Sequence, residues 1–238
     1  MFQALFGLLT FFQFGFKDQK GLISPVPDDL LVENQPLVTE EKKEEILAVR
    51  KLDLTERDQN PYVNQIFKHN ILLALSFSPL LDFLLPIQER LPAGEAGSPL
   101  DETGIKYGFI LEPGQVFAFH ENFSEEFKLK KVITLNTKFS SSEGYQSPGT
   151  ISGDGVCHLA SLINWAASKA GLKVQAKVNH QFRAIPGIPD EYGTSIRYSK
   201  TGLNSQNQNL YIENTFDFPV EFRFTVNEDN LELEVVKG

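Results

Sequence analysis

A single cysteine, Cys157, is present among the 238 residues of this chain. One cysteine cannot form an intramolecular disulfide, and it cannot complete the multi-cysteine ligand set of an ordinary structural zinc site. Neither kind of cross-link is therefore expected to support the fold, and no metal or other cofactor is expected. If Cys157 has a function, it acts through its thiol; the alternative is a small apolar side chain in the core.

Basic residues are also scarce, since 22 Lys and Arg oppose 31 Asp and Glu, which gives a formal net charge of -9. Binding to nucleic acid through counterion release needs a basic face that neutralises phosphates, so nucleic acid is not an expected partner. With 41% hydrophobic residues the chain can nevertheless bury a sizeable core.

No uncharged apolar run is long enough for a comfortable membrane span. Residues 1–16, MFQALFGLLTFFQFGF, are uncharged but shorter than the roughly 20 residues that a helix needs to cross a bilayer. They also lack the basic start and the cleavage site of a secretory signal. Three interpretations stay open: a clipped or wrongly started signal-anchor, a segment on the membrane surface, or an apolar helix packed on the domain.

Residues 17–59 are rich in Pro, Asp, Glu and Lys, which predicts a linker that makes few contacts with the domain. One helix is expected within it, in the stretch TEEKKEEILAVRKL, because Thr39 can cap its start and two glutamates follow in the first turn.

Residues 60–236 carry the patterns of one α+β domain. Apolar residues at helical spacing predict a helix over 62–77, and residues 78–104, with the turn-forming stretch LPAGEAGSPLDETG, are expected to form an inserted loop. Alternating segments toward the C-terminus, NLYIENT, VEFRFTV and LELEVV, predict an antiparallel sheet with one solvated face.

Cys157 lies where a glycine-containing turn meets a helical pattern, in GDGVCHLASLINWAASKAGLK. The pattern predicts a helix that starts at the cysteine and stops at Gly171. Unpaired amides and the dipole at a helix N-terminus stabilise a thiolate, so the pKa of the thiol is expected to be lowered. Gly153 and Gly155 are expected to leave room for a substrate backbone.

A cysteine nucleophile needs a base, and imidazole suits that task near neutral pH. His180 is the first candidate, because it ends KVQAKVNH, a predicted strand that would return alongside the helix. His158 and His120 are weaker candidates. A cysteine that opens a helix, packed on an antiparallel sheet with a nearby histidine, is typical of a papain-like or transglutaminase-like thiol arrangement.

Several motifs occur in an order that resembles the VanW-like family. They read KHNILLA, EPGQVFAF, GDGVCHLAS, NHQFRAIPGIP and IENTFDFPVEF, and the resemblance covers about residues 62–236. It implies a cell-wall context, and some members are described as cysteine-dependent L,D-transpeptidases that cross-link peptidoglycan stem peptides. Carried over by motif, Cys157 would be the nucleophile and His180 the base.

The chain departs from that family at residues that bear on the site. The glycine triplet reads Gly153-Asp154-Gly155, and His158 replaces the glutamine after the cysteine. A carboxylate that orients the base would come from Asp190 or Glu191, or be absent. The candidate substrate-binding residues are Gly153, Asp154, Gly155 and Arg183.

Three functions are compatible with these residues. The first is an extracytoplasmic acyltransferase, anchored to the membrane or associated with the wall, that forms a thioester with a stem peptide and passes the acyl group to an amine. The second is a wall-binding accessory module without chemistry. The third is a thiol hydrolase that uses water as the acceptor. A cytoplasmic location stays open.

Overall fold

The computed structural model describes residues 44–78, 106–149, 154–200 and 203–238. The chain divides into the units Met1–Glu41 and Lys42–Gly238, and every described residue belongs to the second. The apolar segment expected at 1–16 lies outside the described residues, as does nearly all of the insert expected at 78–104. In the part of the chain that is described, no helix has the length and apolarity needed to cross a membrane.

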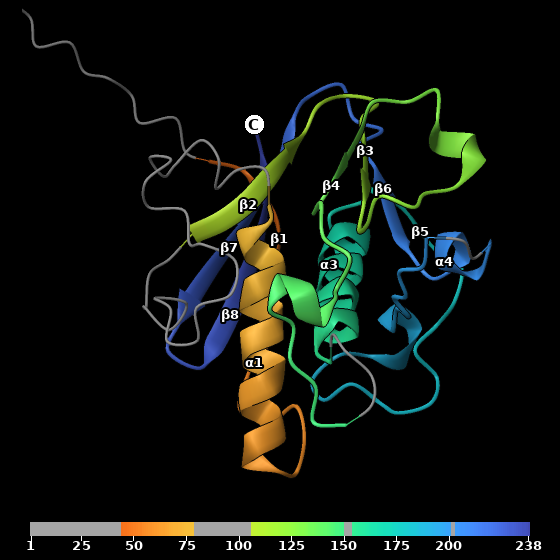
Figure 1. The fold of residues 1–238 in the computed structure, drawn as a ribbon. Helices are drawn as coiled ribbons and strands as arrows, with labels where there is room; N and C mark the ends of the chain where they lie inside the picture. Colours follow the sequence, from red (N-terminus) through yellow and green to blue (C-terminus); the bar gives the residue numbers. More distant parts are fainter. Residues whose placement is uncertain (1–43, 79–105, 150–153, 201–202) are drawn as a thin grey trace, which may run out of the picture. The chain divides into compact units, whose positions relative to one another are not determined.

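The first of two four-stranded sheets contains both ends of the described chain. Its strands are ordered β1 (Ile46–Asp53), β8 (Asn230–Lys237), β7 (Val220–Asn227) and β2 (Lys106–Leu111), and every neighbouring pair is antiparallel (Figure 1). In β7 buried residues alternate with partly exposed ones, which is the pattern of a strand with one face on the core. The predicted α+β class and the antiparallel C-terminal strands are confirmed.

The second sheet consists of shorter strands. Its order is β4 (Val132–Thr134), β3 (Val116–Ala118), β6 (Leu210–Glu213) and β5 (Lys173–Ala176). β3 pairs with β4 in parallel and with β6 antiparallel. The sequence predicted a single sheet; the short buried run of β3 does not alternate, so its pairing partners could not be inferred from periodicity.

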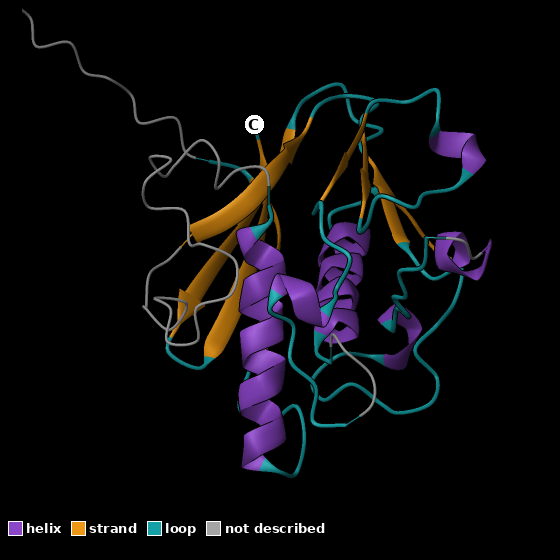
Figure 2. Ribbon diagram, in the orientation of Figure 1, coloured by secondary structure: helices purple, strands orange, loops and turns teal. Residues whose placement is uncertain are grey.

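Two long helices pack against each other and against these sheets (Figure 2). Helix α1 (Pro61–Ser76) starts at Asn60, whose side chain accepts a hydrogen bond from the Tyr62 amide. Helix α3 (Val156–Lys169) contacts β1 and β8 of the first sheet and β5 and β6 of the second. The short helical segments are η3 (Glu125–Phe127), η4 (Ser141–Glu143), η5 (Asp190–Tyr192) and α4 (Leu203–Asn207).

The predicted helix that would end at Leu52 is wrong, because Ile46–Asp53 form strand β1. Seven residues of this strand pair with β8, and Leu52 is buried. Arg50 also stacks on Trp165 of α3, with 4.5 Å between the guanidinium carbon and the ring centroid. Residues 46–53 therefore belong to the folded unit, which corrects the expectation that residues 17–59 are a linker with few contacts.

A set of stacked phenylalanines joins the two sheets in the core. The ring of Phe109, on β2, lies 4.3 Å from that of Phe117, on β3, and 4.5 Å from that of Phe222, on β7. All three are essentially inaccessible to solvent. The sheets and α3 thus share one core.

Candidate active site

The turn that precedes Cys157 is built around Gly155, which caps the start of α3. Its φ of 96° lies in the left-handed region that favours glycine. A Cβ at this position would lie 2.8 Å from the carbonyl oxygen of Phe67, on α1. Glycine therefore allows α1 to approach the turn, which corrects the expectation that Gly155 leaves room for substrate. Gly153 lies outside the described residues.

Asn70 of α1 holds the same turn from a fully buried position. Its amide nitrogen donates to the carbonyl oxygens of Asp154 (2.8 Å) and Gln146 (2.9 Å), and its oxygen accepts from the Gln146 amide (2.9 Å). The carboxylate of Asp154 accepts from the Ser147 hydroxyl, and burial raises the pKa of that carboxyl. Asn70 belongs to KHNILLA, one of the motifs recognised from the sequence. The sequence did not predict that Asn70 holds the cysteine turn.

Cys157 is half-buried, and its thiol faces the backbone of Ile196. The Ile196 amide donates to Sγ at 3.4 Å, and Sγ donates to the Ile196 carbonyl at 3.8 Å. Burial, together with the nearby charge of Asp154, raises the pKa of the thiol to about 11 despite the Ile196 amide. The expectation of a lowered pKa is wrong, because desolvation outweighs the helix N-terminus.

The first two candidates for the base, His158 and His180, lie close to each other. The rings of His158 and His180 are 6.0 Å apart, nearly perpendicular, and His158 also packs edge-on against Phe67 at 5.0 Å. Among the described residues, no hydrogen bond joins Sγ to either imidazole. Consecutive residues of a helix point in directions about 100° apart, so Cys157 faces Ile196 while His158 faces α1 and His180.

His180 is held in one tautomer by the backbone. Strand β5 ends at Ala176, so His180 lies in the loop beyond it and not at the end of a strand as predicted. Its Nδ1 is 2.9 Å from the carbonyl oxygen of Arg183. A carbonyl only accepts, so Nδ1 carries the hydrogen and Nε2 carries the lone pair of a base. Burial lowers the pKa of His180, which keeps the ring neutral near pH 7.

His158 is also neutral and has an unused nitrogen. Its Nδ1 is buried and makes no hydrogen bond within the described part of the chain. Burial, followed by the positive charge of Arg57, lowers its pKa to about 3. His120 is elsewhere: its two ring nitrogens contact Asn209 and Gln208, and burial lowers its pKa to about 4.

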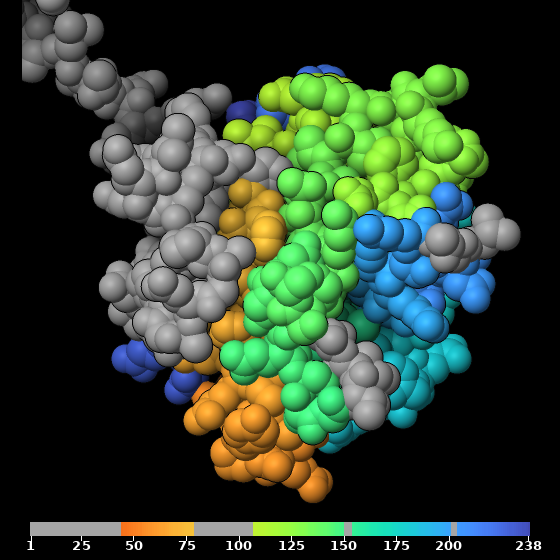
Figure 3. Space-filling view, viewed as in Figure 1, coloured from red at the N-terminus to blue at the C-terminus, as the bar shows by residue number. Residues whose placement is uncertain are grey.

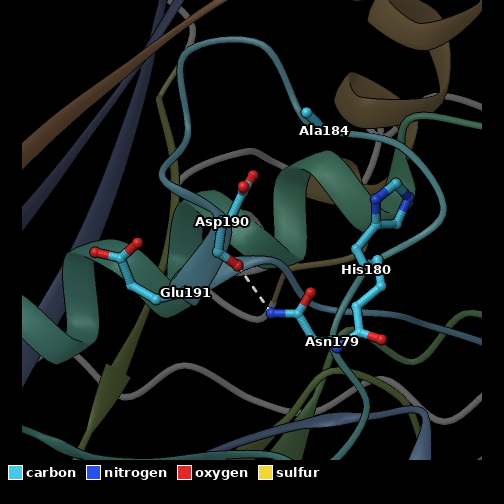
Figure 4. Close-up of a pocket in the computed structure, with 6 residues that line it drawn as sticks. Asn179, His180, Ala184, Asp190 and Glu191 are labelled. Atoms are coloured by element: carbon cyan, nitrogen blue, oxygen red, sulfur yellow. Dashed lines mark hydrogen bonds between the residues drawn. The ribbon is translucent and has the colours of Figure 1, made fainter.

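His180 also lines a pocket of about 380 Å³. The other lining residues are Asn179, Gln181, Ala184, Asp190 and Glu191 (Figure 4). In this view the imidazole lies apart from both carboxylates, and the Asp190 carbonyl accepts a hydrogen bond from the Asn179 amide at 2.8 Å. The group that orients His180 is thus the Arg183 carbonyl, a backbone acceptor that no sequence motif marks.

The arrangement offers a thiol, two neutral imidazoles and a pocket lined by one of them. Within the described ranges, no three His, Cys, Asp or Glu side chains are grouped so that they could hold a metal ion.

The family model described as VanW like protein matches residues 106–236, which is more than half of the chain. The chain belongs to the VanW-like family. No curated protein and no solved structure matches it.

The VanW-like match contains Cys157, His158, His180, Arg183 and Asp190. It begins after β1 and α1. The residues that hold the cysteine turn from the other side, Phe67 and Asn70, therefore lie ahead of the match.

Proposed function

We propose that this protein is a cysteine-dependent acyltransferase that acts on peptides of the cell wall, with Cys157 as the nucleophile and His180 as the base. VanW-like membership supports the cell-wall context. The observation that carries the chemistry is the His180 tautomer, which leaves Nε2 with the lone pair of a base on a residue that lines a pocket. The arrangement would then be of the papain-like or transglutaminase-like kind.

The protonation states favour general-base activation over a preformed ion pair. A thiol with a pKa of about 11 is protonated at neutral pH, and both histidines are neutral. In the proposed reaction Sγ leaves Ile196 and attacks a peptide carbonyl while the imidazole takes the thiol proton. The carbon–nitrogen bond then breaks, the imidazolium protonates the departing amine, and a thioester forms. A second amine attacks the thioester and gives a proton to the imidazole, the carbon–sulfur bond breaks, and the imidazolium returns the proton to the departing sulfur.

The peptide substrates of this reaction lie outside the cytoplasmic membrane. The proposal therefore includes an extracytoplasmic location, with peptidoglycan stem peptides as partners and residues 1–16 as a possible membrane contact.

The test is incubation of the purified chain with a disaccharide-tetrapeptide, followed by mass spectrometry. We expect a thioester adduct on Cys157 and a cross-linked dimer, both lost in Cys157→Ala. His180→Ala should reduce the rate by about 10²- to 10⁴-fold, the usual contribution of a general base. Released amine without a dimer would identify a hydrolase. If neither the adduct nor the dimer forms, the acyltransferase proposal is wrong.

A second candidate is a wall-binding module without chemistry. The raised thiol pKa and the engagement of Sγ by Ile196 favour it. It predicts that the chain binds isolated sacculi equally well as wild type and as Cys157→Ala, with no covalent adduct in either form.

A further inference from the structure

The loop that carries His180 is tied to the connection between β1 and α1, which lies ahead of the VanW-like match. Arg57 is in this connection and is only 2% exposed. Its Nη1 donates to the carbonyl oxygen of Pro186 at 2.8 Å, across 129 positions of sequence. Gly187 lies beside the same guanidinium group, since a Cβ there would be 4.0 Å from Nη2. A buried arginine thus fixes the far end of the loop.

Asp58, the residue after Arg57, holds the end of the same loop that lies nearer to His180. Arg183 donates from Nη1 to the Asp58 carboxylate at 2.6 Å, and the Arg183 carbonyl accepts from His180 Nδ1. One residue of the loop therefore links Asp58 to the imidazole, through its side chain on one side and its carbonyl on the other. The side chain of Arg183 is thus paired with Asp58, whereas the sequence suggested that Arg183 binds substrate.

Asp58 is itself held by the first turn of α1. Its amide donates to Asn64 Oδ1 at 2.5 Å, its carbonyl accepts from Asn64 Nδ2 at 3.0 Å, and its carboxylate accepts from the Asn60 amide at 2.9 Å. The Asn60 amide, followed by the Arg183 hydrogen bond, lowers the pKa of Asp58, so the carboxylate is charged at neutral pH. Asp58 is therefore held by three hydrogen bonds with Asn60 and Asn64, and its side chain is charged at neutral pH.

Other contacts from the same segment reach the site. In the space-filling view the orange surface of residues 54–76 borders the green segment that leads to α3 (Figure 3). Asn70 and Phe67 hold the cysteine turn and His158, as described above. Arg57 and Asp58 add His180 to the groups held from this side.

We propose that Arg57 and Asp58 are positioning residues for His180, so that the site of the VanW-like domain is completed by a segment ahead of the family match. The contacts with the loop stand by themselves, whereas their catalytic meaning rests on the proposed function. A merely structural role would alter stability alone; a positioning role must alter the tautomer and the titration of His180.

The first experiment is a pH titration of the histidine ring nitrogens by NMR on the full chain. The variants are Asp58→Asn, Arg183→Gln and Arg183→Lys, with Glu232→Gln as the matched control, because Glu232 pairs with Lys51 at 2.7 Å on the β1–β8 side. Without the Asp58 pair the loop should open more often, by about two- to fivefold for its amide exchange. His180 should then become more hydrated, show a mixed tautomer and titrate at higher pH.

Arg183→Lys keeps the charge and should restore most of the wild-type titration, while Glu232→Gln should leave His180 unchanged. An unaltered His180 titration and tautomer in both Asp58→Asn and Arg183→Gln would overturn the proposal. Arg57→Met provides an independent arm, since it removes the Pro186 hydrogen bond but keeps the aliphatic stem. It should change the His180 tautomer as well, and a fully wild-type spectrum would also count against the proposal.

These measurements separate the proposal from the proposed function. If the NMR changes occur and the acyltransferase assay is negative for wild type, the positioning holds and the chemistry fails. If the wild type is active and Asp58→Asn keeps its full rate and pH profile with His180 unmoved, the chemistry holds and the positioning fails.

Discussion

Two stretches of the chain meet at Cys157, and they contribute different things. Residues 106–236, the VanW-like match, contain the thiol, both neighbouring histidines and the pocket. Residues 44–78 contain none of the proposed reactive groups, yet they supply Phe67, Asn70, Arg57 and Asp58, which contact the cysteine turn and the His180 loop. The comparison teaches that the family match marks the chemistry but not the whole of the structure that positions it.

The largest expected effect is on the reactivity of the Cys157 thiol. Its pKa depends on burial and cannot be inferred from the family match alone. A pKa raised from about 9 to about 11 leaves about a hundredfold less thiolate at neutral pH than in an ordinary cysteine. Alkylation of Cys157 should therefore be slow at pH 7 and rise steadily through pH 10. The measurement is the labelling rate against pH, with a cysteine-containing peptide as the control. Rapid labelling at pH 6 to 7 would show that the helix N-terminus dominates after all.

Gly155→Ala tests the close approach of the two stretches. The added Cβ would meet the Phe67 backbone at 2.8 Å, and the left-handed φ adds strain. We expect a loss of about 2 to 3 kcal/mol in the free energy of unfolding, measured by denaturant titration. Gly114→Ala is the control, since Gly114 has a φ of 74° with nothing within 4 Å, and it should cost only about 1 kcal/mol. Equal losses would mean that α1 yields easily to the turn.

Asn70→Ala can be compared with Asn214→Ala, because each asparagine is fully buried and makes three similar hydrogen bonds to the backbone. Both variants should lose about 2 kcal/mol of stability, since buried backbone groups lose partners. Only Asn70→Ala should also change the alkylation rate of Cys157. A change of the same size in both variants would break the comparison, because the effect would then follow stability alone.

The smallest effect concerns the Asp58–Arg183 pair, which is partly solvated and so contributes less than about 1 kcal/mol. The folded-state pKa of Asp58 is lowered, so the contribution is present above the unfolded value of about 3.9 and is lost as the pH falls through the folded value. The stability difference between wild type and Asp58→Asn should be constant from pH 5 to 7 and disappear toward pH 2. A difference that grows at low pH would contradict this sign.

Local patterns predicted the elements whose contacts are local. The helix after Cys157, its stop at Gly171 and the alternating strands β7 and β8 follow from periodicity and turn chemistry. Strand β1 did not, because glutamate and lysine before Ile46 favour a helix, whereas the strand forms by pairing with β8 from the opposite end of the chain. Such nonlocal pairing leaves no periodic mark on the sequence.

The site shows the same division. The place of Cys157 in the first turn of a helix was predictable, because glycine and an apolar stripe mark that turn. The thiol pKa was not, because it depends on burial by elements far away in sequence. The contact of His180 with the Arg183 carbonyl was also missed, since a backbone acceptor has no residue signature.

The pairing of β1 with β8 has a further consequence for the order in which the elements of this domain can follow one another along the chain. The Lys237 amide donates to the Glu45 carbonyl at 2.9 Å, so the two ends of the described domain are neighbours. A short linker could join residue 238 to residue 44, and new termini could be opened between residues 78 and 106. The resulting circular permutant would begin at β2 with the family match and carry β1 and α1 as a C-terminal tail. If it folds and keeps the wild-type His180 titration, the site depends on the presence of that segment and not on its being synthesised first.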